Sequence, residues 1–195
     1  MIRATCVYLF IALYILLLAP PGLLWTLISQ DTRLLYSLAR LCIRSAGIIG
    51  GIRVTSIGRE KIDSSKTYLF LSNHRGNIDG PVLFHAIPRN WKALVKQEMM
   101  RLPLFSRVLE QAKFVPVERS NPQKAHEAID AGARLLADGN SFIAFPEGTR
   151  SRDGCLGVFK KGAFIMALRA RVPIVPVTII GSAAVQPPGI FAMKP

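Results

Sequence analysis

The first part of the chain is an unbroken apolar run. No charged side chain occurs over residues 4–29, and a straight helix of that length would measure about 39 Å, enough to cross a bilayer core of about 30 Å. The triplet Pro20-Pro21-Gly22 interrupts the run, so that the part before it would be only about 24 Å long. Three interpretations stay open: a kinked transmembrane helix, a segment that enters one leaflet and turns back, and a signal peptide. The length of the run and the lack of a small-residue cleavage site disfavour the signal peptide.

A basic amphipathic helix is predicted next. At roughly 100° per residue, Arg33, Arg40 and Arg44 fall within about 20° of one line on the helix surface, while leucines occupy another side. Such a helix either lies at a membrane surface or packs on its own domain with a solvated arginine edge. We favour a two-helix membrane anchor with the globular part on the side that holds the arginines. The positive-inside bias makes that side cytoplasmic.

After a small-residue break over residues 47–51, apolar runs of strand length alternate with helical patterns. The pattern predicts strands over residues 53–57, 67–71, 91–96, 113–118, 141–145 and 174–180. It predicts helices over residues 81–86, 97–111, 122–137 and 162–169. This alternation is typical of the α/β class, with a mostly buried mixed sheet flanked by helices. We therefore expect a membrane-associated helical segment over residues 1–48 and one globular domain over residues 49–195.

Charge and composition narrow the class of partner. With 25 Lys and Arg against 12 Asp and Glu, the net charge is +13, and half of the residues are hydrophobic. Such a chain favours anionic lipid headgroups or phosphorylated substrates over nucleic acid, since no nucleic-acid motif or aromatic-interleaved basic patch occurs. The three cysteines, Cys6, Cys42 and Cys155, match no metal spacing and no disulfide framework, so a reducing compartment is expected.

The candidate chemistry begins in the block Asn73-His74-Arg75-Gly76-Asn77-Ile78-Asp79, which follows an apolar strand. An ideal helix would place residues five apart about 140° from each other, so His74 and Asp79 cannot share one helical face. They can meet if His74 lies in the loop and Asp79 begins the next helix. The carboxylate would then fix the imidazole tautomer and leave the other ring nitrogen free to take a proton. On this pair alone the other interpretation stays open, with Asp79 a helix cap and His74 a loop residue.

A second polar block, Glu147-Gly148-Thr149-Arg150, follows the strand predicted over residues 141–145. Gly148 allows the backbone to come close to a ligand, and the planar guanidinium of Arg150 suits a phosphate. An ordinary turn with solvated charges is the alternative. Arg119, after another predicted strand, extends the positive charge, as does the pair Lys160-Lys161. No motif for a serine nucleophile elbow, a phosphate-binding P-loop or a zinc protease is present.

Four blocks, taken in order, resemble the glycerolipid acyltransferase family typified by 1-acyl-glycerol-3-phosphate acyltransferases. The blocks are N-H-x4-D over residues 73–79, a strand ending in arginine over 114–119, F-P-E-G-T-R-S over 145–151 and V-P-I-V-P-V over 172–177. Lys96 also resembles a family lysine that precedes the second block. The resemblance covers roughly residues 50–182, and four blocks in family order and at family-like spacing are highly specific.

The resemblance implies transfer of a fatty acyl group from a thioester to the free hydroxyl of a lysophosphatidate, which gives phosphatidate. His74 would be the base and Asp79 its partner. The residues implied in binding the glycerophosphate are Arg119, Glu147, Gly148, Thr149 and Arg150, with Lys96 as a helper. No covalent acyl-enzyme, metal or bound cofactor is expected, and the donor is either acyl-CoA or acyl-ACP. The family's two-helix anchor agrees with the N-terminal pattern, so we expect a membrane-associated enzyme whose catalytic domain faces the cytoplasm, at a bacterial inner membrane.

The sequence departs from the family pattern at three places. Gly76 stands where a serine is common, so a hydroxyl at that position is absent, and Ala112 stands where a glycine is common. The chain ends at Pro195, soon after the fourth block, which indicates either a fragment or a minimal sheet edge. Two alternatives stay open: an acyltransferase for another acceptor, such as glycerol 3-phosphate or another lysophospholipid, and a non-catalytic membrane protein that binds anionic lipid.

Overall fold

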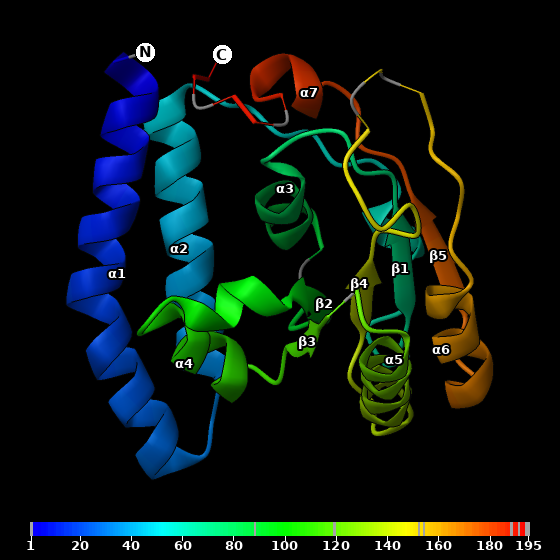
Figure 1. Cartoon of the computed structure of the whole chain (residues 1–195). Coiled ribbons are helices and arrows are strands. Elements are labelled where there is room, and N and C mark those ends of the chain that lie inside the picture. Colours follow the sequence, from blue (N-terminus) through cyan, green and yellow to red (C-terminus); the bar gives the residue numbers. More distant parts are fainter. Residues whose placement is uncertain are drawn as a thin grey trace.

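The molecule consists of an N-terminal helical hairpin packed against a layered α/β domain (Figure 1). The computed structural model describes residues 2–87, 89–118, 120–151, 153, 155–187, 189–190 and 192–193. Within this part of the chain the fold class agrees with the one predicted from the alternation of apolar runs and helical patterns.

The apolar run forms one helix, α1 (Ile2–Ser29), which continues through both prolines. The interruption predicted at Pro20-Pro21-Gly22 is therefore wrong. A methyl group added at Gly22 would lie 2.9 Å from Leu38 of the second helix, so the two helices are closely packed at that point. This packing offsets the stability that α1 loses because the two prolines have no N–H to donate within the helix. Among the described residues, α1 is the one helix long and apolar enough to cross a membrane.

The second helix, α2 (Arg33–Gly50), packs on the α/β domain. Its Tyr36 side chain is buried, and Arg40 donates a hydrogen bond of 2.8 Å to Asn90 at the edge of the domain. Arg44, farther along the predicted arginine edge, is exposed. The arginine edge is therefore not uniform: Arg40 binds the domain, Arg44 is exposed and lines a cavity between the hairpin and the domain, and Arg33 is exposed.

The sheet has five strands in the order β3-β2-β4-β1-β5, and each of the four pairings is parallel. The strands are β1 (Leu69–Ser72), β2 (Lys92–Lys96), β3 (Val115–Val117), β4 (Phe142–Ala144) and β5 (Ile174–Val177). A mixed sheet was expected, and this detail is wrong. Helix-containing crossovers join successive strands, and such connections lead to parallel neighbours.

Two helical layers cover the sheet. Leu69 and Leu71 of β1 join a buried cluster with α5 and α6, whereas Tyr68 and Phe70 face a second cluster with α3. This alternation follows from the two-residue period of a strand. The helices of the domain are α3 (Asp79–Ala86), α4 (Phe105–Gln111), α5 (Pro122–Ala137), α6 (Gly162–Ala170) and α7 (Ser182–Val185), with 3-10 turns at Arg59–Lys61 and Gln97–Arg101.

The segment over residues 53–57 was predicted as a strand, and it does not pair with the sheet. It follows Gly51, which ends α2 in a left-handed conformation with φ of 69°. Ile52 and Val54 instead line a cavity between the hairpin and the domain. Within residues 53–57, Val54 contacts that cavity, whereas Ile57 is almost fully exposed, so neither apolar side chain packs within a sheet.

Candidate active site

The candidate site lies at the carboxyl edge of the parallel sheet, where loops follow β1 and β4. Backbone N–H groups of both loops donate hydrogen bonds across to the other loop: the N–H of Ser151 donates to the carbonyl of His74 at 2.8 Å, and the N–H of His74 donates to Glu147 Oε1 at 2.8 Å. Crevices outside the carboxyl ends of parallel strands are the usual place for ligands in this architecture. The two polar blocks that are far apart in the sequence are thus neighbours in space.

His74 and Asp79 form a direct pair. His74 Nδ1 lies 2.7 Å from Asp79 Oδ2, with His74 in the loop after β1 and Asp79 as the first residue of α3. The imidazole stacks on Phe145, with ring centroids 3.9 Å apart and planes inclined by 15°. Since Nδ1 is engaged by the carboxylate, Nε2 is the nitrogen that remains for a substrate proton. The His74 side chain is 22% exposed, so a substrate can reach it.

The carboxylate of Asp79 is fully buried, and its Oδ2 also accepts the backbone N–H groups of Arg75 at 2.7 Å and Gly76 at 2.9 Å. Burial is the largest single influence on the pKa of Asp79 and raises it. Hydrogen bonds from His74, Ser182, Gly76 and Arg75 together outweigh burial and hold the pKa below its ordinary value. Asp79 is therefore ionised near neutral pH and can stabilise an imidazolium on His74.

Glu147 is buried, and both of its carboxylate oxygens accept backbone N–H groups. Oε1 accepts from His74, and Oε2 accepts from Gly157 at 2.8 Å. A carboxylate engaged in this way holds the loop after β1 against the loop after β4, and it has less capacity left for a ligand.

Positive charge gathers beside this pair. Arg150 is exposed and donates a hydrogen bond to the side chain of Asn77 in the His74 loop. Gly148 has a φ of 71°, which favours glycine. A side chain at Gly148 would lie 3.2 Å from the ammonium of Lys160. The neighbouring Thr149 is exposed, and together these groups present cations and a glycine turn that suit an anionic ligand.

One further predicted residue belongs to a strand on the far side of β4 from β1. Lys96 ends β2 at the same carboxyl edge, and its ammonium lies 3.2 Å from Glu98. Arg119 lies outside the described residues. No three metal-ligating His, Cys, Asp or Glu side chains gather within the described part of the chain.

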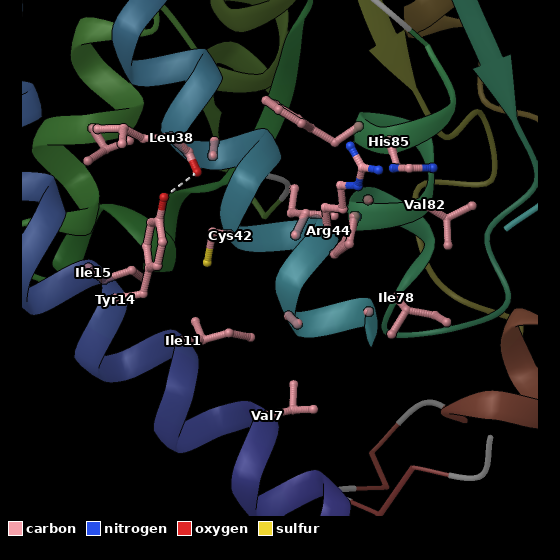
Figure 2. Close-up of a pocket in the computed structure, with 18 of the residues that line it drawn as sticks. Val7, Ile11, Tyr14, Ile15, Leu38, Cys42, Arg44, Ile78, Val82 and His85 are labelled. Carbon is pink, nitrogen blue, oxygen red and sulfur yellow. Dashed lines mark hydrogen bonds between the residues drawn. The ribbon is translucent and has the colours of Figure 1, made fainter. Parts of the chain in front are cut away.

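A large apolar cavity of about 780 Å³ lies between the hairpin and the domain. Figure 2 shows Val7, Ile11 and Tyr14 of α1 on one side of it, with Leu38 and Cys42 of α2 nearby. Ile78 and Gly80, the residues on either side of Asp79, also line this cavity. The volume is within the range of about 300–1,000 Å³ that is typical of small-molecule sites. The cavity thus extends from α1 to the start of α3, beside Asp79, although neither His74 nor Asp79 lines it.

Sequence reasoning did not assign two residues of this region. Phe145 supports the imidazole ring by stacking, and Lys160 lies against Gly148. Both belong to segments that were noticed for other reasons, the F-P-E-G-T-R-S block and the Lys160-Lys161 pair. A pattern in the sequence shows that such residues are present but not which neighbour they contact.

The chain belongs to the acyltransferase family. The family profile described as Acyltransferase matches residues 53–180, which include both loops of the site and all five strands.

Individual relatives agree with this assignment. The chain is 35% identical over 154 residues to a 1-acyl-sn-glycerol-3-phosphate acyltransferase from Limnanthes douglasii, with 76% of this chain and 55% of the relative covered. It is 31% identical over 147 residues to a protein of the same name from Borreliella burgdorferi, with 75% and 59% covered. The chain thus spans little more than half the length of these curated relatives.

A solved structure has the same fold. The crystal structure of the 1-acyl-sn-glycerophosphate (LPA) acyltransferase PlsC from Thermotoga maritima matches the whole of this chain and 79% of that chain, with a TM-score of 0.87 and 23% sequence identity. The match confirms the α/β fold preceded by two helices.

Proposed function

We propose that this chain transfers a fatty acyl group from an acyl thioester to the free hydroxyl of 1-acyl-glycerol 3-phosphate, giving phosphatidate for phospholipid synthesis. The observation that carries the proposal is the His74 Nδ1–Asp79 Oδ2 contact of 2.7 Å, next to both a cationic loop and an apolar cavity. An acceptor that is an alcohol, an anion and a lipid needs these three features together. The names of the relatives support the same acceptor.

In the proposed reaction, Nε2 of His74 takes the proton of the acceptor hydroxyl as its oxygen attacks the thioester carbonyl. The C–O bond forms, the tetrahedral adduct collapses, and the C–S bond breaks. The leaving thiolate then takes the proton from the imidazolium, so the imidazole is neutral again. Asp79 stabilises the transient imidazolium through Nδ1. General-base assistance of this kind contributes about 10²–10⁴ in rate.

The phosphate of the acceptor is proposed to bind at the turn after β4. Arg150 and Lys160 supply charge, and Gly148 lets the backbone approach the phosphate. Glu147 would act by holding this turn against His74 rather than by touching substrate. Arg119, Thr149 and Lys96 remain proposed members of this site.

The fatty acyl chain is proposed to lie in the apolar cavity. The cavity borders Ile78 and Gly80, so a thioester carbonyl at His74 could extend its hydrocarbon into it. Burial of hydrocarbon stabilises such a complex by about 0.8 kcal/mol per methylene. The walls from α1 would make the hairpin part of the donor site as well as a membrane attachment.

The apolar helix α1 is consistent with membrane association. We propose that residues 1–48 anchor the protein, and that the domain over residues 49–195 faces the cytoplasm, in a bacterium at the inner membrane. Many large apolar side chains of α1 are exposed and would contact lipid: Ile2, Leu9, Leu13, Leu16, Leu17, Leu24, Trp25, Leu27 and Ile28. Both acyl-CoA and acyl-ACP are anionic and suit the net charge of +13.

The test is an acyl-transfer assay on the purified protein in detergent micelles and in anionic vesicles. Radiolabelled palmitoyl-CoA and palmitoyl-ACP are each offered with lysophosphatidate, glycerol 3-phosphate or lysophosphatidylcholine. We expect labelled phosphatidate from lysophosphatidate, and much slower transfer to lysophosphatidylcholine. Vesicle binding without transfer to any acceptor would contradict the proposal and favour a non-catalytic lipid-binding protein.

A further inference from the structure

The segment that follows β5 is clamped to the His74 loop from both ends. On one side, the amide of Asn73 donates to the carbonyl of Ile179 at 2.9 Å and accepts the N–H of Ile179 at 2.7 Å. On the other side, the backbone N–H of Asn77 donates to the carbonyl of Gln186 at 3.0 Å. Ser182 lies between these two anchor points, at the start of α7. Its backbone is therefore fixed relative to the loop that holds the catalytic pair.

Ser182 fills the space that a side chain at Gly76 would need. A Cβ added to Gly76 would lie 2.7 Å from the backbone oxygen of Ser182 and 2.9 Å from its Cβ. Gly76 itself donates its N–H to Asp79 Oδ2 at 2.9 Å. The Ser182 segment therefore packs directly on the backbone turn that binds the Asp79 carboxylate.

Two buried oxygens at this contact lack a hydrogen bond of normal geometry to any described residue. They are Asp79 Oδ1 and Ser182 Oγ. Asp79 is fully buried and Ser182 is 4% exposed. Leaving a buried polar atom unpaired costs about 1–3 kcal/mol, and more for a charged group, so these two oxygens call for an explanation.

The hydroxyl of Ser182 is near enough to the carboxylate of Asp79 to act on it. Among the groups that lower the pKa of Asp79, against the larger opposing effect of burial, is the hydroxyl of Ser182. A hydroxyl rotates to suit its partner, so rotation about the Cα–Cβ bond of Ser182 is able to aim its O–H at the carboxylate. Each unpaired oxygen thereby gains the other as its partner.

We propose that Ser182 is a positioning residue of the active site, whose hydroxyl donates to Asp79 Oδ1 while His74, Arg75 and Gly76 donate to Oδ2. This inference rests on the proposed function. With donors on both oxygens, the plane of the carboxylate is fixed, and with it the direction in which the imidazole of His74 presents Nε2. The hydroxyl that Gly76 does not carry is supplied from a segment more than a hundred residues further along the chain.

The test compares Ser182→Ala with Ser182→Thr and with a matched control. Ser141→Ala is the control, because Ser141 is equally buried at 4% but binds Tyr68 and Arg89 at the opposite end of β4. We expect Ser182→Ala to lower kcat for acyl transfer about tenfold with KM for lysophosphatidate within about twofold, and Ser182→Thr to recover most of the loss. Ser141→Ala should lower the Tm and leave kcat unchanged.

A second readout does not depend on acyl transfer. The protein is labelled with ¹³C at the aspartate carboxyl carbons, the Asp79 signal is assigned with Asp79→Asn, and its titration is followed in micelles. Ser182→Ala removes one donor to the ionised carboxylate, so the pKa of Asp79 should rise. Ser141→Ala should leave the pKa of Asp79 unchanged.

Unchanged kcat and an unchanged Asp79 titration in Ser182→Ala would overturn the inference. So would a Ser141→Ala protein that reproduces both effects. A wild-type protein that transfers no acyl group, with an Asp79 titration that still responds to Ser182→Ala, would refute the proposed function and leave the Ser182–Asp79 hydrogen bond standing.

Discussion

The carboxylate of Glu147 accepts the backbone N–H of His74 at 2.8 Å, which ties together two loops whose residues are 73 positions apart in the sequence. The second oxygen of Glu147 accepts the N–H of Gly157, so the same side chain also holds the segment that leads to Lys160. Through one buried acid, the position of the candidate base and the position of the cationic turn depend on each other.

Replacing Glu147 with glutamine tests this link. The amide would set an NH₂ group against one of the two backbone N–H donors, so one hydrogen bond is lost and a buried donor is left unpaired. We expect Glu147→Gln to lower the free energy of unfolding by about 1–3 kcal/mol and to reduce kcat as well. Urea unfolding and the transfer assay measure the two effects. Glu127→Gln on the exposed face of α5 is the control, and equal behaviour of the two variants would contradict the role of Glu147.

Arg150 is predicted to contribute mainly to binding of the acceptor phosphate. Charge-assisted hydrogen bonds contribute about 1.5–3 kcal/mol, so Arg150→Gln should lower kcat/KM for lysophosphatidate by roughly 10- to 100-fold, largely through KM. Steady-state kinetics with varied lysophosphatidate measure the change. Arg134→Gln, on the exposed side of α5, removes the same charge away from the site and should have little effect. A loss confined to kcat would argue against phosphate binding by Arg150.

The apolar cavity is predicted to limit the length of the acyl chain. Cys42 lines it from α2, so Cys42→Phe should reduce the volume available and shift the preference toward shorter donors. Rates with a series of acyl-CoA chain lengths report the preference. Cys6→Phe adds the same group at an exposed position of α1 and should leave the profile unchanged. An unchanged profile in Cys42→Phe would place the acyl chain elsewhere.

Lys92 is predicted to destabilise the fold at neutral pH. Its ammonium is buried and donates to the Tyr36 hydroxyl at 3.0 Å. Burial, with a smaller contribution from Lys113, lowers the pKa of Lys92 from 10.5 to about 8. The unfolded chain thus binds more protons between about pH 8 and 10.5, so stability rises with pH across that window and the full cost is present below it.

Lys92→Met should therefore raise the free energy of unfolding at pH 7 by about 1–3 kcal/mol, with a gain that shrinks as pH approaches 10. Urea unfolding at several pH values measures it. Lys61→Met, at an exposed site of the 3-10 turn over Arg59–Lys61, should show no such pH-dependent difference. A constant difference between wild type and Lys92→Met at all pH values would contradict the argument.

Much of the fold was predictable where local signals agree with tertiary packing. The helix predicted over residues 122–137 is found with those bounds, because Asn121 caps it by accepting the N–H of Lys124 and Pro122 suits its first turn. The break predicted at Pro20 and Pro21 is wrong, since the packing of α1 on α2 overrides the local effect of the prolines. The segment at 53–57 was also predicted wrongly, because Val54 faces a cavity and Ile57 faces solvent, and no local pattern reveals either.

The candidate site was predictable only in part. The spacing of His74 and Asp79 indicated a pair, and the pair is formed, because Asp79 begins α3 as that interpretation required. The hydrogen bond from the backbone N–H of His74 to Glu147 could not be predicted from the sequence, since almost any residue supplies such an N–H. Ser182 escaped notice for a similar reason: its neighbour Gly76 is remote in the chain, and only the topology brings them together.

The proposed role of His74 as the base is tested by the turnover of His74→Ala. The variant is assayed for transfer of labelled palmitate to lysophosphatidate in micelles, at saturating substrate, beside circular dichroism and thermal unfolding to establish that it is folded. We expect kcat to fall by about 10²–10⁴ while the fold is retained. A folded His74→Ala protein that turns over at the wild-type rate would contradict it.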